Sequence, residues 1–162
     1  MFGSDILSGI GAASAIVLLG VTAQAGPKLP DDCEIRDGSP YSCSPMVGCL
    51  GVTDYFTGRA LGWNKGSHIS QSGGGLNCIG EWRGSGRLGL GEATVECDGD
   101  LTGLAYFYSR DPQTGTGRGM GRLSDGRTLR VWYGQEVEQF LRNEYGDVNY
   151  FEMCKNADAP IG

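Results

Sequence analysis

The single histidine is the residue best suited to acid–base chemistry in this sequence. His68 lies between Ser67 and Ser70 in a stretch rich in serine and glycine. Catalysis by a serine nucleophile requires an imidazole held by a partner. The G-x-S-x-G motif of one large hydrolase class is missing from the sequence. We therefore predict that His68 is a solvent-exposed loop residue and that the chain has no catalytic residues.

Paired carboxylates are the second candidate for catalysis. Two acids several ångströms apart can flank a glycosidic bond and cleave it. Glu92 with Glu96, or Glu81 with Asp98, offer such pairs. The sequence has 19 acidic residues, so closely spaced pairs are unavoidable. A small hydrolase that acts on envelope glycans therefore stays an alternative to a non-catalytic role.

Metal and nucleotide sites are not predicted. Glycines at 115, 117, 119 and 121 resemble a dinucleotide-binding fingerprint, but that motif opens a helix and a strand-like run follows here. The acids around Asp98 and Asp111 lack the spacing and distal glutamate of a calcium loop. With one histidine and cysteines expected to be oxidised, a tetrahedral zinc site lacks ligands. We expect no metal and no cofactor.

The charge of the chain limits its partners. The formal net charge is −6 and the sequence pI is about 4.7. Nucleic acids and anionic membranes are bound through clusters of Lys and Arg, which an acidic chain of this kind does not predict. We expect no nucleic-acid partner, and membrane contact only if an N-terminal anchor is retained.

The N-terminal 25 residues have the pattern of an export signal. Residues 6–21 are almost all apolar or small, and Ala23-Gln24-Ala25 forms an A-x-A cleavage pattern. The alternative is a retained anchor over residues 6–23, although several glycines make this stretch weakly hydrophobic for a membrane span. We expect a periplasmic or secreted protein, or one anchored in the inner membrane and facing the periplasm.

Six cysteines in an exported chain predict three disulfides. Cys78 and Cys97 end the two arms of one expected hairpin, so they are the favoured pair. Cys43 with Cys49 would close a small loop, which leaves Cys33 with Cys154 to join the ends of the domain. These last two pairings are hypotheses, because six cysteines allow 15 connectivities.

Glycine makes up 29 of the 162 residues, which argues against a helical bundle. Residues 26–50 predict an irregular Cys- and Pro-rich segment, and residues 51–162 a single β-rich domain. Within it, 51–63 fits a helix or a strand, and 64–75 is expected to be a mobile loop. We predict an antiparallel meander of five to seven strands. Five of these strands are expected at 76–84, 89–97, 101–109, 117–124 and 127–134.

The chain after Gly134 predicts one helix. Apolar residues at 137, 140, 141 and 145 share a helical face, and Gly146 follows as a stop signal. The helix is expected near residues 135–145, followed by a last strand over residues 148–154. We expect a frayed tail after residue 155.

Glycines alternate along the strand expected at 117–124. Gly117, Gly119 and Gly121 leave one face of that strand without side chains. Trp132, Tyr106 and Tyr108 on the neighbouring strands are expected to lie over this bare face. Asp98-Gly99 and Ser124-Asp125-Gly126 are expected to be hairpin turns, since glycine tolerates the positive φ that such turns require.

One region resembles a known repeat family. Gly80-Glu81-Trp82, Gly89-Leu90-Gly91, Asp98-Gly99 and Gly103 resemble a MORN repeat, and Gly119-Met120-Gly121, Asp125-Gly126 and Gly134 resemble a second copy. The resemblance covers residues 80–134. It implies a meander of β-hairpins that acts as a scaffold or a contact surface for proteins or membranes.

Aromatic and arginine residues are dense on the expected strands. Exposed rings beside arginine are typical of interaction surfaces. We predict a non-catalytic binding or structural module of the bacterial envelope that contacts a protein or a glycan. An accessory subunit of a membrane complex is a further alternative. The candidate binding residues are Trp82, Arg83, Tyr106, Tyr108, Arg118, Arg130 and Trp132.

Overall fold

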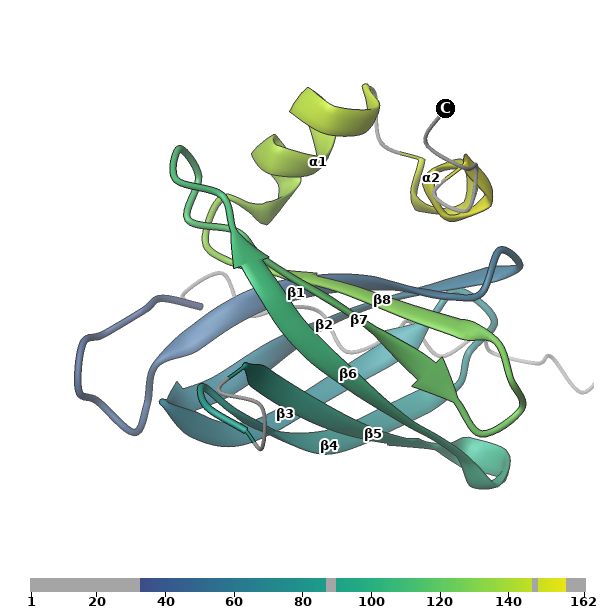
Figure 1. The fold of residues 1–162 in the computed structure, drawn as a ribbon, viewed down its shortest axis with the longest axis horizontal. Coiled ribbons are helices and arrows are strands. Elements are labelled where there is room, and N and C mark those ends of the chain that lie inside the picture. Colours follow the sequence, from purple (N-terminus) through teal and green to yellow (C-terminus); the bar gives the residue numbers. More distant parts are fainter. Residues whose placement is uncertain (1–32, 87–89, 147–148, 157–162) are drawn as a thin grey trace, which may run out of the picture.

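The computed structural model describes residues 33–86, 90–146 and 149–156. Here eight antiparallel strands follow one another in sequence order and close into a barrel, because the last strand pairs with the first (Figure 1). The strands are β1 (Cys43–Leu50), β2 (Asp54–Trp63), β3 (Lys65–Ser72), β4 (Asn77–Arg83), β5 (Gly91–Cys97), β6 (Leu101–Arg110), β7 (Gly117–Leu123) and β8 (Thr128–Tyr133). A short 3-10 turn, η1 (Asp98–Asp100), joins β5 to β6. Two helices, α1 (Val137–Tyr145) and α2 (Tyr150–Asn156), follow β8.

The mainly β, antiparallel prediction is confirmed, and so are the five expected strands, which correspond to β4 to β8. The helix expected near 135–145 is α1, and Gly146 ends it with a positive φ. Closure into a barrel of eight strands and the second helix go beyond the prediction. The expected export signal over residues 1–25, or anchor over 6–23, lies outside the described residues.

Two expectations are wrong, because the segment predicted as irregular contains β1 and the segment predicted as a loop contains β3. Residues 64–75 are predicted as a loop because their inward positions in β3 are His68, Ser70 and Ser72, which are buried although polar. No apolar alternation marks this strand. β1, within the segment predicted as irregular, is buried on both faces and so also lacks a period of two. Residues 51–63, which fit either element, form β2.

The segment 148–154 is also corrected. Its described residues, 149–154, contain no strand; α2 occupies Tyr150–Asn156 instead. Tyr150, Met153 and Cys154 are spaced three and four residues apart and share one face of the helix, which packs on the outside of the barrel. Both helices lie against the β1 side of the barrel (Figure 1), where Val137, Phe140 and Leu141 of α1 cover Trp132.

All six cysteines are oxidised. The predicted Cys78–Cys97 bridge is confirmed and joins β4 to β5. The other two pairings are wrong: Cys33 bonds Cys43, and Cys49 bonds Cys154. Cys43 and Cys49 are six residues apart in one extended strand, so they cannot approach each other. Three disulfides indicate an oxidising compartment outside the cytoplasm. Neither described helix is long and apolar enough to cross a membrane.

The bare face of β7 is covered by aromatic rings, as predicted, but by different ones. A side chain at Gly117 would overlap the ring of Tyr133, and one at Gly119 would lie 2.6 Å from the ring of Phe107. Phe107 and Tyr133 point into the barrel, where their rings meet edge to face at 4.8 Å. Tyr106 and Trp132 are one residue away in their strands and therefore face outward.

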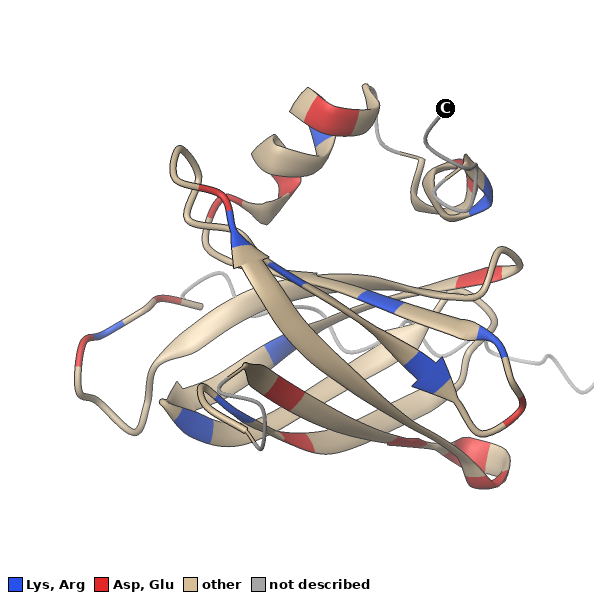
Figure 2. Ribbon diagram, viewed as in Figure 1, with Lys and Arg blue, Asp and Glu red and all other residues tan. Residues whose placement is uncertain are grey.

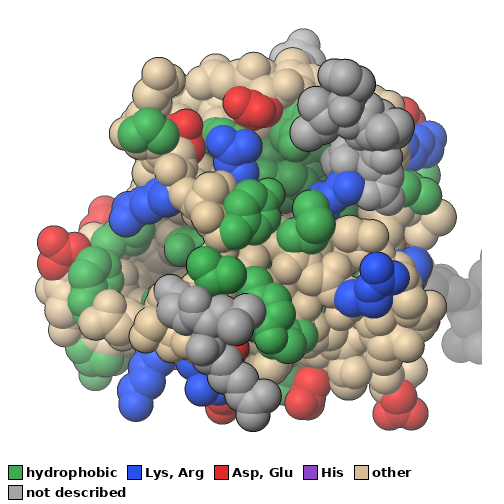
Figure 3. Space-filling model, in the orientation of Figure 1, with side chains coloured by type: hydrophobic (Ala, Val, Ile, Leu, Met, Phe, Trp, Pro, Cys, Tyr) green, Lys and Arg blue, Asp and Glu red, His purple; other side chains and the backbone are tan. Residues whose placement is uncertain are grey.

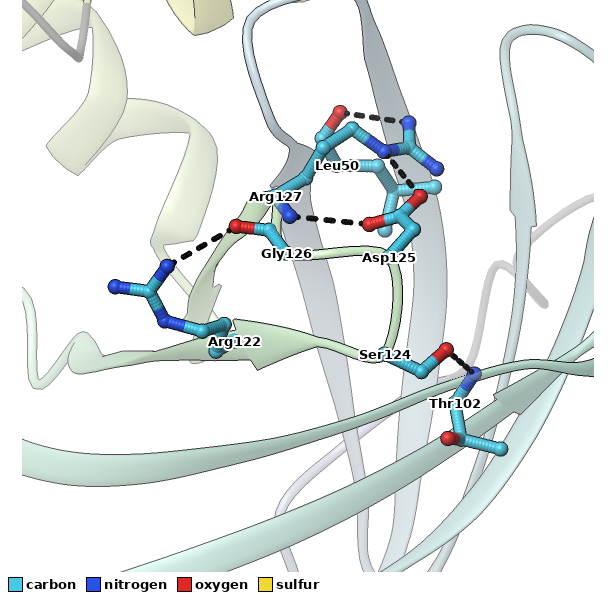
Figure 4. A network of polar contacts seen from close by, with 7 residues as sticks. All are labelled: Leu50, Thr102, Arg122, Ser124, Asp125, Gly126 and Arg127. Carbon is cyan, nitrogen blue, oxygen red and sulfur yellow. Dashed lines mark hydrogen bonds and ion pairs between the residues drawn. The ribbon is translucent and has the colours of Figure 1, made fainter.

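The turn between β7 and β8 ties the strands together at one end of the barrel (Figure 4). The Asp125 carboxylate accepts hydrogen bonds from the Arg127 backbone N–H at 3.0 Å and from its Nε at 2.6 Å. The Arg127 guanidinium also donates to the Leu50 carbonyl of β1. The bond to Leu50 joins the turn before β8 to β1 where the barrel closes. The hydrogen bonds from Arg127 lower the pKa of Asp125.

Candidate functional site

The two ends of the barrel interior differ. The end near η1 is filled by large apolar side chains, namely Leu50, Phe56, Cys78, Val95, Leu101, Leu123 and Leu129. The opposite end, on the left in Figure 1, contains a cavity of about 350 Å³. Its lining includes Ser44, Met46, Ala60, Trp63, His68, Trp82, Ala93, Phe107, Arg110, Val131 and Tyr133. A pocket of this size is at the lower end of the range for small-molecule sites.

The loop before β1 borders the mouth of the cavity. Ile35, Asp37 and Ser42 of this loop contribute to the lining. The Cys33–Cys43 disulfide closes the loop covalently, and the Arg36 N–H donates to Ser42 Oγ at 3.2 Å. The Gly62 N–H of β2 donates to the Ser42 carbonyl at 2.7 Å. The disulfide therefore holds part of the cavity wall in place.

One wall of the cavity is polar and crosses four strands. Ser44 of β1 pairs with Ala60 of β2, Ala60 pairs with His68 of β3, and His68 pairs with Gly80 of β4. Ser44 and His68 are 8% and 3% exposed. Ser44 Oγ and His68 Nδ1 have no hydrogen-bond partner among the described residues.

His68 is buried, which corrects the prediction of a solvent-exposed loop residue. Its Nε2 lies 2.6 Å from the carbonyl oxygen of Thr94 in β5. This nitrogen must carry the proton, since a carbonyl only accepts. Burial lowers the pKa of His68, and the bond to Thr94 opposes that shift. The imidazole is therefore neutral at pH 7, and its Nδ1 is a hydrogen-bond acceptor.

Gly80 explains how a side chain of β3 reaches β5. A β-carbon at Gly80 would overlap both His68 Nε2 and the Thr94 carbonyl oxygen. β4 and β5 pair on both sides of this point, at Ile79–Glu96 and at Trp82–Ala93. Between these pairs the Glu81 N–H donates a hydrogen bond to the Thr94 hydroxyl at 3.3 Å. The Thr94 carbonyl accepts the hydrogen bond from His68 Nε2–H.

The remaining wall is mainly aromatic and apolar. The Trp82 indole N–H donates to the Leu61 carbonyl at 3.0 Å, so the polar atom of the ring is satisfied and the ring borders the cavity. Phe107 and Tyr133 add two further rings, and Met46 and Val131 add aliphatic surface. Burial raises the pKa of Tyr133, so this phenol is neutral at pH 7.

The acidic pairs considered for glycoside hydrolysis do not meet in this cavity. Asp37 is the single carboxylate among the described lining residues. Glu92 forms an ion pair with Arg83 at 2.9 Å, and Asp98 accepts hydrogen bonds from Asn77. A two-carboxylate mechanism therefore lacks one of its groups here. The described residues also contain no cluster of metal-binding side chains.

The structure separates the predicted binding residues into four places. Trp82 lies inside the barrel, and Arg83 lies on the outer face of β4. Trp132 is 5% exposed because α1 covers it, so it does not offer an open contact surface. The other four, Tyr106, Tyr108, Arg118 and Arg130, lie on β6, β7 and β8 and form one outer surface with Met120.

The outer surface of β6 to β8 combines exposed rings with positive charge. Tyr108 and Met120 are 55% and 45% exposed, and the Arg118 guanidinium lies 4.7 Å from the centre of the Phe140 ring. These three strands contain four arginines and no acid, whereas acids gather in turns such as η1 (Figure 2). Figure 3 shows hydrophobic side chains near the middle of this face, with basic side chains on both sides.

Sequence reasoning missed the cavity residues His68, Ser44, Phe107 and Tyr133. A signal for His68 exists in the spacing of His68, Ser70 and Ser72, which places three polar residues on one face of an extended strand. That pattern is typical of a polar interior wall when a barrel closes around it. The pairing of β8 with β1 is what makes this face an interior.

No family model matches this chain, and no curated protein sequence matches it. A solved structure, described as the de novo design of a fluorescence-activating β-barrel, is similar to 58% of this chain and 91% of that chain. The TM-score is 0.46 and the sequence identity is 11%. We infer nothing about function from this similarity. The resemblance to MORN repeats stays a prediction.

Proposed function

We propose that this chain is a non-catalytic binding protein that holds a small, mainly apolar molecule inside its barrel. The observation that carries this proposal is the unequal filling of the barrel, with a packed apolar end and a cavity of about 350 Å³ at the other end. A closed barrel of eight strands is wide enough to hold one small ligand when side chains do not fill it.

The chemistry of the lining supports a binding role. Small-molecule sites are mostly apolar and aromatic, with a few polar groups that fix the orientation of the ligand. Trp82, Phe107 and Val131 supply the apolar surface, while His68 and Ser44 supply buried polar atoms. Most of the residues that line the cavity come from strands, and a disulfide closes the loop that supplies Ile35, Asp37 and Ser42, so the site is largely formed before a ligand enters.

We place this binding protein outside the cytoplasm, in the periplasm or secreted from a bacterial cell. The three disulfides support an oxidising location, and the apolar N-terminal sequence supports export. The alternative of an N-terminally anchored accessory subunit differs in whether residues 6–23 are retained. The intact mass of the natively expressed protein distinguishes the two.

A second candidate function uses the outer surface of β6 to β8. Four of the seven predicted binding residues gather there, beside the exposed Met120 and Tyr108. Exposed aromatic and arginine side chains are typical of contact surfaces for other macromolecules. Because the strands contribute only positive charge to this surface, an acidic envelope protein or an acidic glycan fits it best.

The cavity proposal is tested with a neutral ring compound of suitable size. We expect the full chain to bind 2-methylnaphthalene in equilibrium dialysis, followed through the fluorescence of the ligand. Ala60 borders the cavity between Ser44 and His68, so the substitution Ala60→Phe places a ring in the ligand space. This variant should lower the affinity at least about tenfold.

The matched control adds the same ring on the outside of the barrel. Ile79 of β4 is 60% exposed, so Ile79→Phe should leave the affinity unchanged. Equal loss in both variants would show that the compound binds elsewhere, and no binding to the unmodified protein would contradict the proposed function.

A further inference from the structure

His68, which borders the cavity, contains a buried hydrogen-bond acceptor without a donor. His68 Nδ1 is buried and has no partner among the described residues, while its Nε2–H is committed to the Thr94 carbonyl. Buried polar atoms in native proteins are almost always hydrogen-bonded, so an unpartnered one calls for a ligand or a bound water. The fixed tautomer means that the missing group at Nδ1 is a donor.

The two walls of the cavity differ in the chemistry they offer. The polar wall contains His68 and Ser44, whose Nδ1 and Oγ atoms are buried and unpartnered, and the small side chain of Ala60 separates the two residues in the row across β1, β2 and β3. The remaining wall presents the aromatic rings of Trp82, Phe107 and Tyr133. A molecule that satisfies both walls has a flat aromatic body and a polar edge.

The charge of that molecule follows from the same residues. His68 is neutral and Ser44 is uncharged, so among the described lining residues the charged groups are Asp37 and Arg110. Asp37 and Arg110 come from the loop before β1 and the end of β6, which border the mouth. A charged ligand group placed against the polar wall would lose its hydration without gaining an ionic partner there.

We propose that the cavity selects a neutral aromatic molecule of roughly one or two fused rings that carries a hydroxyl or N–H group, and that this group donates its hydrogen bond to His68 Nδ1. This inference rests on the proposed function, because it names the ligand class of the same cavity. Gly80 is the positioning residue: it leaves the space through which the imidazole reaches Thr94 and so directs Nδ1 as an acceptor.

The experiment compares two ligands of equal size on two forms of the full chain. 2-Naphthol and 2-methylnaphthalene differ in one group, a hydroxyl donor against a methyl. Their dissociation constants are measured for the unmodified protein and for His68→Phe. The preference for 2-naphthol should fall about tenfold in the variant, since one buried hydrogen bond is lost. The ratio of the two ligands cancels any general change in the cavity.

A second measurement needs no variant. His68 is the single histidine in the sequence, so its ring nitrogens give unambiguous ¹⁵N signals in the full chain. The Nδ1 resonance should move to lower frequency when 2-naphthol is added and stay in place with 2-methylnaphthalene. This readout reports the hydrogen bond directly, even if His68→Phe does not fold.

The outcomes separate the two proposals. If both ligands bind but the preference is the same in both protein forms and Nδ1 does not respond, the role of His68 is wrong and the cavity remains a binding site. If neither ligand binds the unmodified protein, the proposed function fails, and the inference fails with it. A lost preference together with a shifted Nδ1 signal supports the inference.

Discussion

The two ends of the barrel use the same strands but different side chains. At the closed end, large aliphatic residues from opposite strands meet, and Leu50 of β1 and Leu129 of β8 are almost completely buried. At the open end, the inward positions of β1 to β3 are small or polar, as at Ser44, Ala60 and His68. The closed end therefore supplies most of the apolar stabilisation, and the open end is left free to hold a ligand.

The largest expected effect tests this division of roles directly. Leu50→Ala at the closed end should lower the free energy of unfolding by about 4 kcal/mol, because it leaves a cavity in a fully packed region. Met46 lies four residues before Leu50 in β1 and points to the same face of the strand. Met46→Ala should lower the free energy of unfolding by roughly 2 kcal/mol, since Met46 already borders an open space. Denaturant unfolding of the oxidised proteins measures both values.

Ligand binding sharpens the same comparison. Leu50 lies outside the cavity lining, so Leu50→Ala should keep the affinity for 2-methylnaphthalene, whereas Met46→Ala should change it. Equal costs in stability for the two variants would mean that the two ends are packed alike, and the distinction between them would be lost.

The next effect concerns Phe107, which lines the cavity and also packs against the apolar core. Gly119→Val places a branched side chain against the Phe107 ring, because even a β-carbon there would lie 2.6 Å from that ring. The expected loss is about 1–3 kcal/mol from overpacking. Met120→Val, next to it but facing solvent, is the control and should change stability much less. An unchanged melting temperature for Gly119→Val would contradict the packing of Phe107 on β7.

The smallest effect is a dependence of stability on pH at the open end. Burial lowers the pKa of His68 in the folded protein, so the unfolded chain takes up a proton at higher pH than the folded one. The contribution of His68 to the free energy of unfolding should therefore be constant above about pH 6.5 and should fall as the pH drops toward the folded pKa. His68→Phe should lack this contribution.

The carboxyl groups of Asp111 and Asp125 affect the free energy of unfolding in a lower range of pH. Hydrogen bonds lower the pKa values of Asp111 and Asp125 below 3.8, so their contributions are lost only in stronger acid. A difference between the unmodified protein and His68→Phe that appeared only below pH 4 would contradict a buried, neutral His68.

Much of the strand order could be predicted because β4 to β8 obey local rules. Turn residues such as Gly99 and Gly126 adopt the positive φ that their hairpins require, and the strands between them alternate or carry aromatic residues. The Cys78–Cys97 bridge was predictable for the same reason, since both residues pair directly across one hairpin. The helix α1 was predictable from the spacing of Val137, Phe140 and Leu141.

The candidate site could not be predicted from such local rules. Ser70 and His68 look like solvent-facing residues of a loop, and they are buried because β8 returns to β1 and encloses them. The same closure turns Trp82 inward, while α1 covers Trp132, so two expected surface rings are not surface rings.

The sequence by itself determined most of the residues that prefer extended backbone, the turns between them, the amphipathic helix α1 and the oxidised state of the cysteines. These properties depend on neighbours in the chain or on composition. The tertiary structure decided which face of each strand became interior, how Cys33, Cys43, Cys49 and Cys154 paired, and that one end of the barrel remained unfilled. Those outcomes depend on contacts between distant residues, because only the pairing of β1 with β8 brings the polar wall and the aromatic wall around one space.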